Sequence, residues 1–285
     1  MTTFLTAQSL IKDAVQLYSL PDIYFQIREM IRDPRFTAVD IGRVIAKDPA
    51  LSMRLLKIVN SSFYGFQARI DTISRAITII GIEELQSLAL ATSVVDTFAD
   101  ISDELVDMTD FWVKSVDCAV LAKLLAKKSN VLHAERLFVT GLLHDIGALV
   151  IYTRLPELAK TVLKQAQGKK RNLPRIEQIT LGFTRADVGA ELADAWNLPK
   201  SLSEAIRWQH TPEKAIVSRL DAHLLNLAIQ LSDDRTAVES TLSRLPPATL
   251  SILRISESTV KQVMATSVDE FNTVFSLLAP GKQFH

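Results

Sequence analysis

The chain has 285 residues, of which 48% are hydrophobic and 22% charged, and its 32 basic residues balance 32 acidic ones. This length suits one large or two modest domains with a proper core, and the apolar share excludes disorder over most of the chain. The net charge of zero removes the global attraction to polyanions that many nucleic-acid-binding proteins use, although a local basic patch is compatible with it.

The cellular setting expected from the sequence is soluble and cytoplasmic. A single cysteine, Cys118, excludes an intramolecular disulfide and is typical of a reducing compartment. Residues 1–11 lack the basic and apolar regions of a signal peptide. The longest uncharged apolar stretches, such as residues 85–95, are far shorter than the ~20 residues of a membrane span, so no membrane partner is expected.

Helical periodicity dominates the chain. Apolar residues recur at three- to four-residue intervals, whereas the alternation typical of strands is nearly absent. This pattern predicts an all-α protein with roughly fourteen helices. In chain order, the clearest segments are residues 24–31, 37–46, 51–59, 73–80, 83–98, 111–127 and 186–196.

Several of these segments carry signals at their ends. Thr37 and the pair Asp71-Thr72 precede apolar runs as helix caps do, and Pro49 is suited to a first helical turn. Gly81 is expected to separate two helices, because its missing Cβ permits a left-handed turn.

Charge is unevenly distributed although it sums to zero. Residues 83–110 contain eight acids and no Lys or Arg, whereas residues 160–175 contain six basic residues and no acid. The short polar segment 99–110 is the expected seam between two units. We predict an N-terminal helical bundle over residues 1–103, packed on a larger helical domain over residues 104–285.

The feature that carries chemistry is GLLHDIG at residues 141–147, which places an imidazole and a carboxylate side by side in apolar surroundings. Buried His and Asp side chains need partners, because an unpaired buried charge is strongly unfavourable. Adjacent positions on a helix lie about 100° apart, so His144 and Asp145 can share one ion only if other helices close around it. The alternative for His144 is a core histidine bonded to a backbone carbonyl.

On this motif and several others, the chain resembles HDOD-domain proteins, a regulatory branch of the HD superfamily of metal-dependent phosphohydrolases. The resemblance extends from about Leu20 to about Ser232, and its segments are specific together rather than singly. It rests on LP at 20–21, AKDPAL at 46–51, LLKIVNSS at 55–62, ISRAITIIG at 73–81, FWVKS at 111–115, GLLHDIG at 141–147 and VGAELADAWNLP at 188–199. The resemblance implies an HD-like domain beneath the N-terminal bundle.

Catalytic HD enzymes hold one or two metal ions with histidines from several helices, the His-Asp pair and a later Asp. Carried over by position, the first of these histidines is replaced by Lys114, at about the expected spacing before His144. The histidine expected before Val188 is replaced by Arg185. Two ligand positions of the pattern are therefore cationic in this chain.

The remaining positions are also altered. A double histidine after Trp208 is reduced to Gln209-His210, and the last Asp falls near Asn226 or Ile229. The resemblance thus implies a degenerate site with no catalytic residue, no bound metal and no other cofactor. What is left of the ligand set is His144, Asp145 and His210.

The basic replacements suggest what holds such a site together. A catalytic zinc ion has at least three protein ligands, and an ammonium or guanidinium group in its place repels it. We therefore expect Lys114 or Arg185 to pair with Asp145, so that a salt bridge replaces the metal as the cross-link between helices.

Residues 37–62 have a functional and a structural interpretation. They are typical of a helix, a turn and a second helix, which in a DNA-binding protein would place Arg54, Lys57 and Asn60 on the nucleic acid. The alternative is a plain helical hairpin of the bundle, which the resemblance and the neighbouring acidic run favour.

The basic run at residues 160–175 is a candidate patch for an anionic or protein partner. Its other interpretation is a solvated helix end and loop, because Gly168 and Pro174 favour a loop. The candidate contact residues are Lys164, Lys169, Lys170 and Arg171.

The function that the resemblance implies is bacterial signal transduction or regulation by a non-catalytic protein, which binds a signalling partner in trans or a small ligand such as a nucleotide. The first alternative is a phosphohydrolase acting on a nucleotide or cyclic dinucleotide, with Fe, Mn or Zn held by His144, Asp145 and His210. The second alternative is a nucleic-acid-binding regulator.

Overall fold

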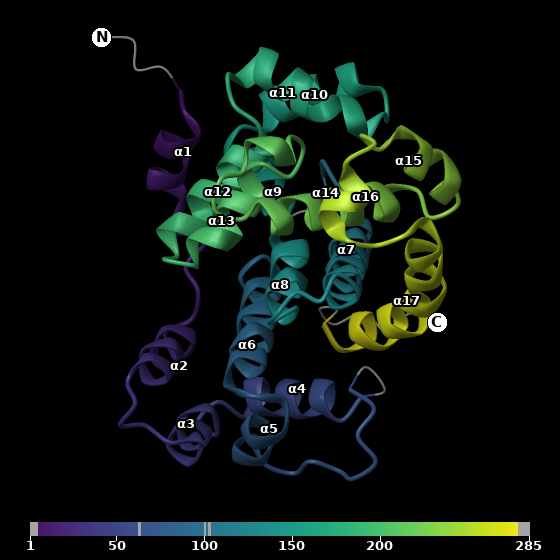
Figure 1. Cartoon of the computed structure of the whole chain (residues 1–285). Coiled ribbons are helices and arrows are strands. Elements are labelled where there is room, and N and C mark those ends of the chain that lie inside the picture. The colour runs from purple at the N-terminus through teal and green to yellow at the C-terminus, as the bar shows by residue number, and fades with distance from the viewer. Residues whose placement is uncertain (1–4, 62–63, 100, 102–103, 279–285) are drawn as a thin grey trace.

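The structure is a computed structural model that describes residues 5–61, 64–99, 101 and 104–278. All regular secondary structure in these residues is helical, as the sequence predicts (Figure 1). The N-terminal helices are α1 (Ala7–Ala14), α2 (Asp22–Arg32), α3 (Ala38–Ile45), α4 (Pro49–Val59), α5 (Ile73–Ile80) and α6 (Ile82–Thr97). They are followed by α7 (Met108–Lys128), α8 (Glu135–Leu143), α9 (Ile146–Arg154), α10 (Pro156–Ala166), α11 (Leu173–Leu181), α12 (Arg185–Ala195), α13 (Lys200–Arg207), α14 (Arg219–Asp233), α15 (Val238–Arg244), α16 (Thr249–Leu253) and α17 (Glu257–Leu278). Two short 3₁₀ helices are η1 (Lys170–Asn172) and η2 (Pro212–Lys214).

The seven segments predicted from periodicity correspond to α2, α3, α4, α5, α6, α7 and α12, and each end lies within three residues of the observed one. The expected number of roughly fourteen helices is too low, since the described residues contain seventeen α-helices. Short helices such as α15 and α16 account for part of the difference, because seven and five residues are too few to display a repeating apolar stripe.

The capping signals act as predicted. The Thr37 hydroxyl accepts a hydrogen bond from the Asp40 N–H at 3.3 Å, and the Asp40 carboxylate accepts one from the Thr37 N–H at 2.9 Å, which forms a capping box at the start of α3. Pro49 occupies the first turn of α4. Gly81 has a φ of 88° and separates α5 from α6, whose axes differ by 119°.

Helix α7 is the centre of the molecule. It is buried along most of its length, and α8, α14 and α17 pack directly against it. Helix α12 packs between α9 and α13, while α2 to α6 form a second layer that meets the first where α6 packs on α8 (Figure 1). Buried apolar side chains from α1 to α17 belong to one continuous cluster.

Both ends of the described chain pack across the division predicted at residues 103 and 104. Helix α1 lies against α9 and α12, and α17 lies against α4 and α6 in addition to α7. Residues 100, 102 and 103 of the predicted polar seam lie outside the described residues. The position of the boundary between the two predicted units therefore stays a prediction.

One helical stretch, Glu135–Arg154, is long and apolar enough to cross a membrane by length and composition alone. It comprises α8 and α9, and 78% of its apolar window is buried inside the protein. A buried stretch of this kind is typical of core helices in soluble proteins.

The close approach of α9 to α12 depends on Gly147. A Cβ at this position would overlap the carbonyl oxygen of Arg185 and would lie 2.5 Å from the backbone nitrogen of Gly189. A Cβ on Gly189 would instead meet Cγ2 of the Ile206 side chain at 3.3 Å. Gly147 therefore sets the distance between the His-Asp motif and the helix that carries Arg185.

We expect Gly147→Ala to lower the free energy of unfolding by about 2 kcal/mol or more, because an added methyl group must displace the backbone of α12. Urea unfolding followed by circular dichroism measures this change. Gly189→Ala is the matched control in the same interface. It should lower the free energy of unfolding clearly less, because the Ile206 side chain can adjust. Equal losses in the two variants would contradict the assigned role of Gly147.

Candidate functional site

A cavity of about 440 Å³ brings together most of the residues that the resemblance singles out. Lys114 from α7, His144 and Asp145 from the junction of α8 and α9, Arg185 from α12, and His210 after α13 all line it. These side chains are far apart in the sequence, so the cavity exists only because the helices pack as described.

Asn226 is not among the residues that line the cavity. Its amide donates a hydrogen bond to the backbone carbonyl of Gln209 at 2.6 Å, and the Gln230 amide donates to its side-chain oxygen at 2.7 Å. Asn226 thus holds the segment that leads into His210. Ile229, the other candidate for the last position of the pattern, does line the cavity.

The His-Asp pair lies at a break between two helices. Helix α8 ends at Leu143 and α9 begins at Ile146, and Asp145 has φ −108° and ψ 9°, outside helical geometry. The two side chains are therefore released from the fixed angular offset of neighbours on one helix. This break allows His144 and Asp145 to bind different partners.

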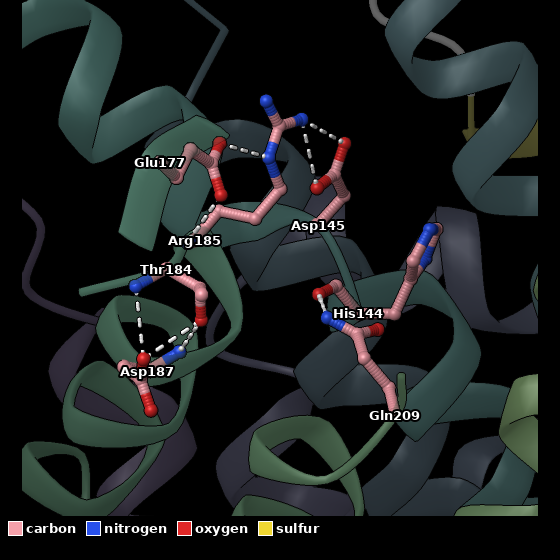
Figure 2. Close-up of polar contacts among 7 residues, drawn as sticks. All are labelled: His144, Asp145, Glu177, Thr184, Arg185, Asp187 and Gln209. Atoms are coloured by element: carbon pink, nitrogen blue, oxygen red, sulfur yellow. Dashed lines mark hydrogen bonds and ion pairs between the residues drawn. The ribbon is translucent and has the colours of Figure 1, made fainter. Parts of the chain in front are cut away.

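Two hydrogen bonds hold His144, one to Gly141 and one from Gln209, and Figure 2 shows the second. Its Nδ1 lies 2.7 Å from the Gly141 carbonyl oxygen, and because a carbonyl can only accept, Nδ1 carries the proton and Nε2 is left as an acceptor. The Gln209 amide donates to the His144 carbonyl oxygen at 2.9 Å. The contact between Nδ1 and the Gly141 carbonyl is the one expected of a core histidine, yet the His144 ring also faces the cavity.

Arg185 is the central cation of the site (Figure 2). Its Nη1 lies 3.2 Å from both carboxylate oxygens of Asp145, and its Nε donates to Glu177 at 2.6 Å. The backbone N–H of Arg185 donates to the second oxygen of Glu177 at 2.9 Å. The guanidinium carbon also lies 5.9 Å from the centre of the Tyr152 ring. The expected salt bridge to Asp145 is therefore present, and Arg185 forms it.

Local sequence explains why Arg185 lies where it does. Thr184 caps α12, since its hydroxyl accepts from the Asp187 N–H at 3.2 Å while the Asp187 carboxylate accepts from the Thr184 N–H at 2.8 Å (Figure 2). The capping box fixes Arg185 as the first residue of the helix. From there its side chain crosses between Glu177 on α11 and Asp145.

The charges of this pair stabilise each other. Burial alone would raise the pKa of Asp145, but the guanidinium of Arg185, together with the smaller contributions of His144 and Lys170, holds that pKa below its ordinary value. Burial alone would lower the pKa of Arg185, but the Asp145 and Glu177 carboxylates raise it well above its ordinary value. Both groups are therefore ionised at neutral pH.

The residues of the His-Asp site do not converge as ligands of one metal ion. Both oxygens of Asp145 face Arg185, and among the described residues the one set of three His, Asp or Glu ligand atoms within 4.8 Å of one another is Glu83, His133 and Glu135 at the surface. A catalytic zinc site needs three protein ligands. The arrangement of His144, Asp145 and His210 does not fit a divalent ion.

Lys114, the second cationic replacement, pairs with a different acid. Its Nζ lies 3.6 Å from Asp110, one turn earlier on α7. Lys170 lines the same cavity, and its Nζ lies 3.8 Å from Asp233 on α14. Burial lowers the pKa of Lys170, and the nearby ammonium of Lys114 lowers it further.

The predicted basic patch is divided by the fold. Lys169, Lys170 and Arg171 line a second cavity of about 540 Å³, whereas Lys164 is on α10 and lines neither cavity. The expected loop is short, because α10 continues to Ala166 and α11 begins at Leu173, where Pro174 is tolerated in the first turn.

Two of the three side chains proposed for DNA contact are engaged within the protein, whereas Lys57 is exposed. Arg54 lies 2.6 Å from Asp96 of α6. The Asn60 amide donates to the carbonyl oxygens of Leu56 and Ile70, at 2.8 Å and 2.7 Å. These contacts favour the helical-hairpin interpretation of residues 37–62.

Three residues of the site were not predicted from the sequence. Glu177 holds Arg185, Tyr152 covers the guanidinium, and Asp233 follows Ile229 by one helical turn on the cavity side of α14. The i, i+4 spacing of Ile229 and Asp233 is the one signal that would have found Asp233. Glu177 and Tyr152 carry no such signal, because α9, α11 and α12 meet only in the folded chain.

The helical fold and the His-Asp frame place the chain in the HD-like class. A protein-family model described as the HDOD domain matches residues 17–212, and this chain belongs to the HDOD family. An uncharacterized protein of Treponema pallidum (strain Nichols) is 31% identical over an alignment of 264 residues that covers 88% of this chain and 49% of that protein. The chain therefore spans about half the length of this curated relative.

Solved structures show the same fold. An HDOD domain protein with unknown function from Geobacter sulfurreducens has a TM-score of 0.78 at 21% identity, with 96% of this chain and 98% of that chain covered. A protein of Shewanella amazonensis SB2B, provisionally named a phosphohydrolase, has a TM-score of 0.76 at 24% identity, with coverage of 95% and 98%. At these identities the likeness concerns the fold.

Removing the guanidinium of Arg185 should lower the stability of the folded protein. We expect Arg185→Met to lower the free energy of unfolding by about 3 kcal/mol or more at pH 7, because it leaves the Asp145 and Glu177 carboxylates buried without their cation. Arg175→Met, at an exposed position on α11, is the control and should change stability by less than about 0.5 kcal/mol. Urea unfolding of both variants measures this, and similar stabilities would contradict the importance of the ion pair.

The pH dependence of stability should report the environment of His210. His210 is exposed and lines the cavity, yet desolvation by the surrounding protein lowers its pKa from 6.5 to about 4, while the Asp145 charge opposes part of the shift. As the pH falls from 6.5 towards 4, the unfolded chain binds a proton that the folded protein does not, so folding loses stability in this window. We expect His210→Gln to lose less stability than the wild type between pH 7 and pH 5 in urea unfolding. Identical losses would contradict the assigned pKa.

Proposed function

We propose that this chain is a regulatory HDOD protein without phosphohydrolase activity. The observation that carries the proposal is the place of Arg185. Its side chain is 8% exposed and bridges Asp145 and Glu177 at a position where the family pattern has a metal-binding histidine. A fixed cation there links α12, α11 and the α8–α9 junction, which is the mechanical role that a metal ion would otherwise have.

Electrostatics support a site without a metal cofactor. Both oxygens of Asp145 bind the guanidinium, so a divalent ion at this carboxylate would meet the repulsion of Arg185 at short range. The remaining ring nitrogens of His144 and His210 are too few for a catalytic ion. In this proposal the cavity has no catalytic residue, and its polar groups bind a ligand without reacting with it.

The regulatory part of the proposal rests on the family. HDOD proteins are the regulatory branch of the HD superfamily. In this chain Lys114, Arg185 and Gln209 stand where the enzymes of the superfamily have histidines. We propose that the protein acts in the cytoplasm, through a partner protein in trans whose binding depends on the state of the site cavity. Nucleic acid is not a partner in this proposal, since Arg54 and Asn60 are engaged internally.

Metal content tests the proposal. Protein purified without chelator or nickel should contain less than about 0.1 equivalents of Fe, Mn or Zn by elemental analysis, because two positive charges occupy ligand positions. The same protein should not hydrolyse bis-p-nitrophenyl phosphate with added Mn²⁺. The double variant Lys114→His/Arg185→His removes both cations and should gain measurable binding of Mn²⁺ or Zn²⁺ in calorimetry.

Stoichiometric metal in the wild type that disappears in Asp145→Ala would refute this function and support the phosphohydrolase. Metal that persists in Asp145→Ala would instead come from elsewhere, and the exposed group of Glu83, His133 and Glu135 would be examined with His133→Ala. In that case the absence of hydrolysis would still support the proposal.

A further inference from the structure

The site cavity adjoins a second hollow of different chemistry. The two share Lys114, Gly168, Lys170 and Asp233 in their walls, so they meet at these residues. Apolar side chains form one part of the wall of the first, including Phe111, Tyr152, Leu163, Leu173, Pro174 and Ile229, while its acids are Asp107, Asp110, Asp145 and Asp233. The second is basic, with Lys114, Lys169, Lys170, Arg171 and Arg244 against the two acids Asp233 and Asp234. We refer to them as the apolar chamber and the basic groove.

Lys114 and Lys170 lie at the junction with hydrogen-bonding capacity to spare. Their nearest acids are 3.6 Å and 3.8 Å away, well beyond the 2.7–2.9 Å of a strong charge-assisted hydrogen bond. Each ammonium has three N–H donors. The two cations are also close enough that Lys114 disfavours the charge of Lys170. An anion bound between them would accept these donors and remove the repulsion.

The chamber offers acceptors and flat surfaces to the rest of such a ligand. Nε2 of His144 is an acceptor, because Nδ1 is committed to the Gly141 carbonyl, and Asp233 adds a carboxylate. The buried hydroxyl of Ser115 lines the chamber and has no hydrogen-bond partner among the described residues. Phe111 and Tyr152 supply aromatic rings. These groups suit a planar ring system with N–H and O–H donors.

We propose that the two compartments together bind a purine nucleotide, with its base in the apolar chamber and its phosphates between Lys114 and Lys170 at the mouth of the basic groove. A chamber of about 440 Å³ lies in the range of small-molecule sites. This inference rests on the proposed function, because a metal-loaded HD site would draw the phosphates to the His-Asp pair instead. Here two lysines rather than a metal ion hold the phosphates, so the nucleotide is bound and left intact.

Isothermal titration calorimetry without divalent metal tests the inference, with GTP, ATP, guanosine, adenosine and pyrophosphate as probes. At least one of the two triphosphates should bind. Its own nucleoside and pyrophosphate should each bind at least about tenfold more weakly, because each fills only one compartment. Lys114→Gln and Lys170→Gln should each weaken triphosphate binding by about tenfold or more.

Lys164→Gln is the matched control, since Lys164 belongs to the same basic stretch but lines neither compartment, and it should bind within about twofold of the wild type. Circular dichroism confirms that the three variants are folded. Three results would each overturn the inference: no binding of either triphosphate, equal binding of pyrophosphate and triphosphate, or wild-type affinity in both Lys114→Gln and Lys170→Gln.

The same samples separate this inference from the function on which it rests. Chromatography of the nucleotide after titration, and again after Mn²⁺ is added, should recover it unchanged. Hydrolysis would refute the non-catalytic function, while the calorimetric affinities would still decide whether the two compartments form the binding site. Absence of binding would refute the nucleotide site and leave the metal analysis to decide the function.

Discussion

The buried guanidinium of Arg185 is the interaction on which the rest of the site depends. It joins the carboxylate of Asp145, at the junction of two helices, to that of Glu177 on a third, and the Tyr152 ring lies beside it. A buried ion pair repays the loss of hydration only when its hydrogen-bonding groups are satisfied. Here two carboxylates and a backbone N–H complete the network, so the cation fixes the relative positions of three segments.

Local features of the backbone position the guanidinium of Arg185 beside Asp145. The capping box of Thr184 and Asp187 starts α12 at Arg185, and Gly147 allows α9 to approach α12 at backbone distance. The break at Asp145 turns its carboxylate towards the guanidinium while His144 remains tied to Gly141. Each constraint is local, yet together they link α12, α11 and the α8–α9 junction through buried protein charges.

The proposed replacement of a metal ion by Arg185 has a functional consequence for an HDOD protein. A metal ion supplies both a cross-link and reactivity, whereas an arginine supplies only the cross-link. The cavity remains open after the exchange, with Lys114 and Lys170 at one side and apolar walls behind them. In the function we propose, a ligand enters this cavity and changes the packing of the surrounding helices without being consumed.

The sequence by itself determined the helical class, the caps at Thr37 and at Thr72, whose hydroxyl accepts from the Arg75 N–H, the division of α5 from α6 at Gly81, and the family. These features depend on periodicity, on side chains acting within one turn, and on motif letters, all of which are local in the chain. It also determined that a cation would meet Asp145, because the basic replacements fall on known ligand positions. Only the tertiary structure decided that Arg185 rather than Lys114 makes the bridge, that Glu177 shares it, and that Lys170 and Asp233 reach the same cavity. These contacts join helices distant in sequence, and their distances depend on how α7, α9, α11, α12 and α14 pack, which no local pattern encodes.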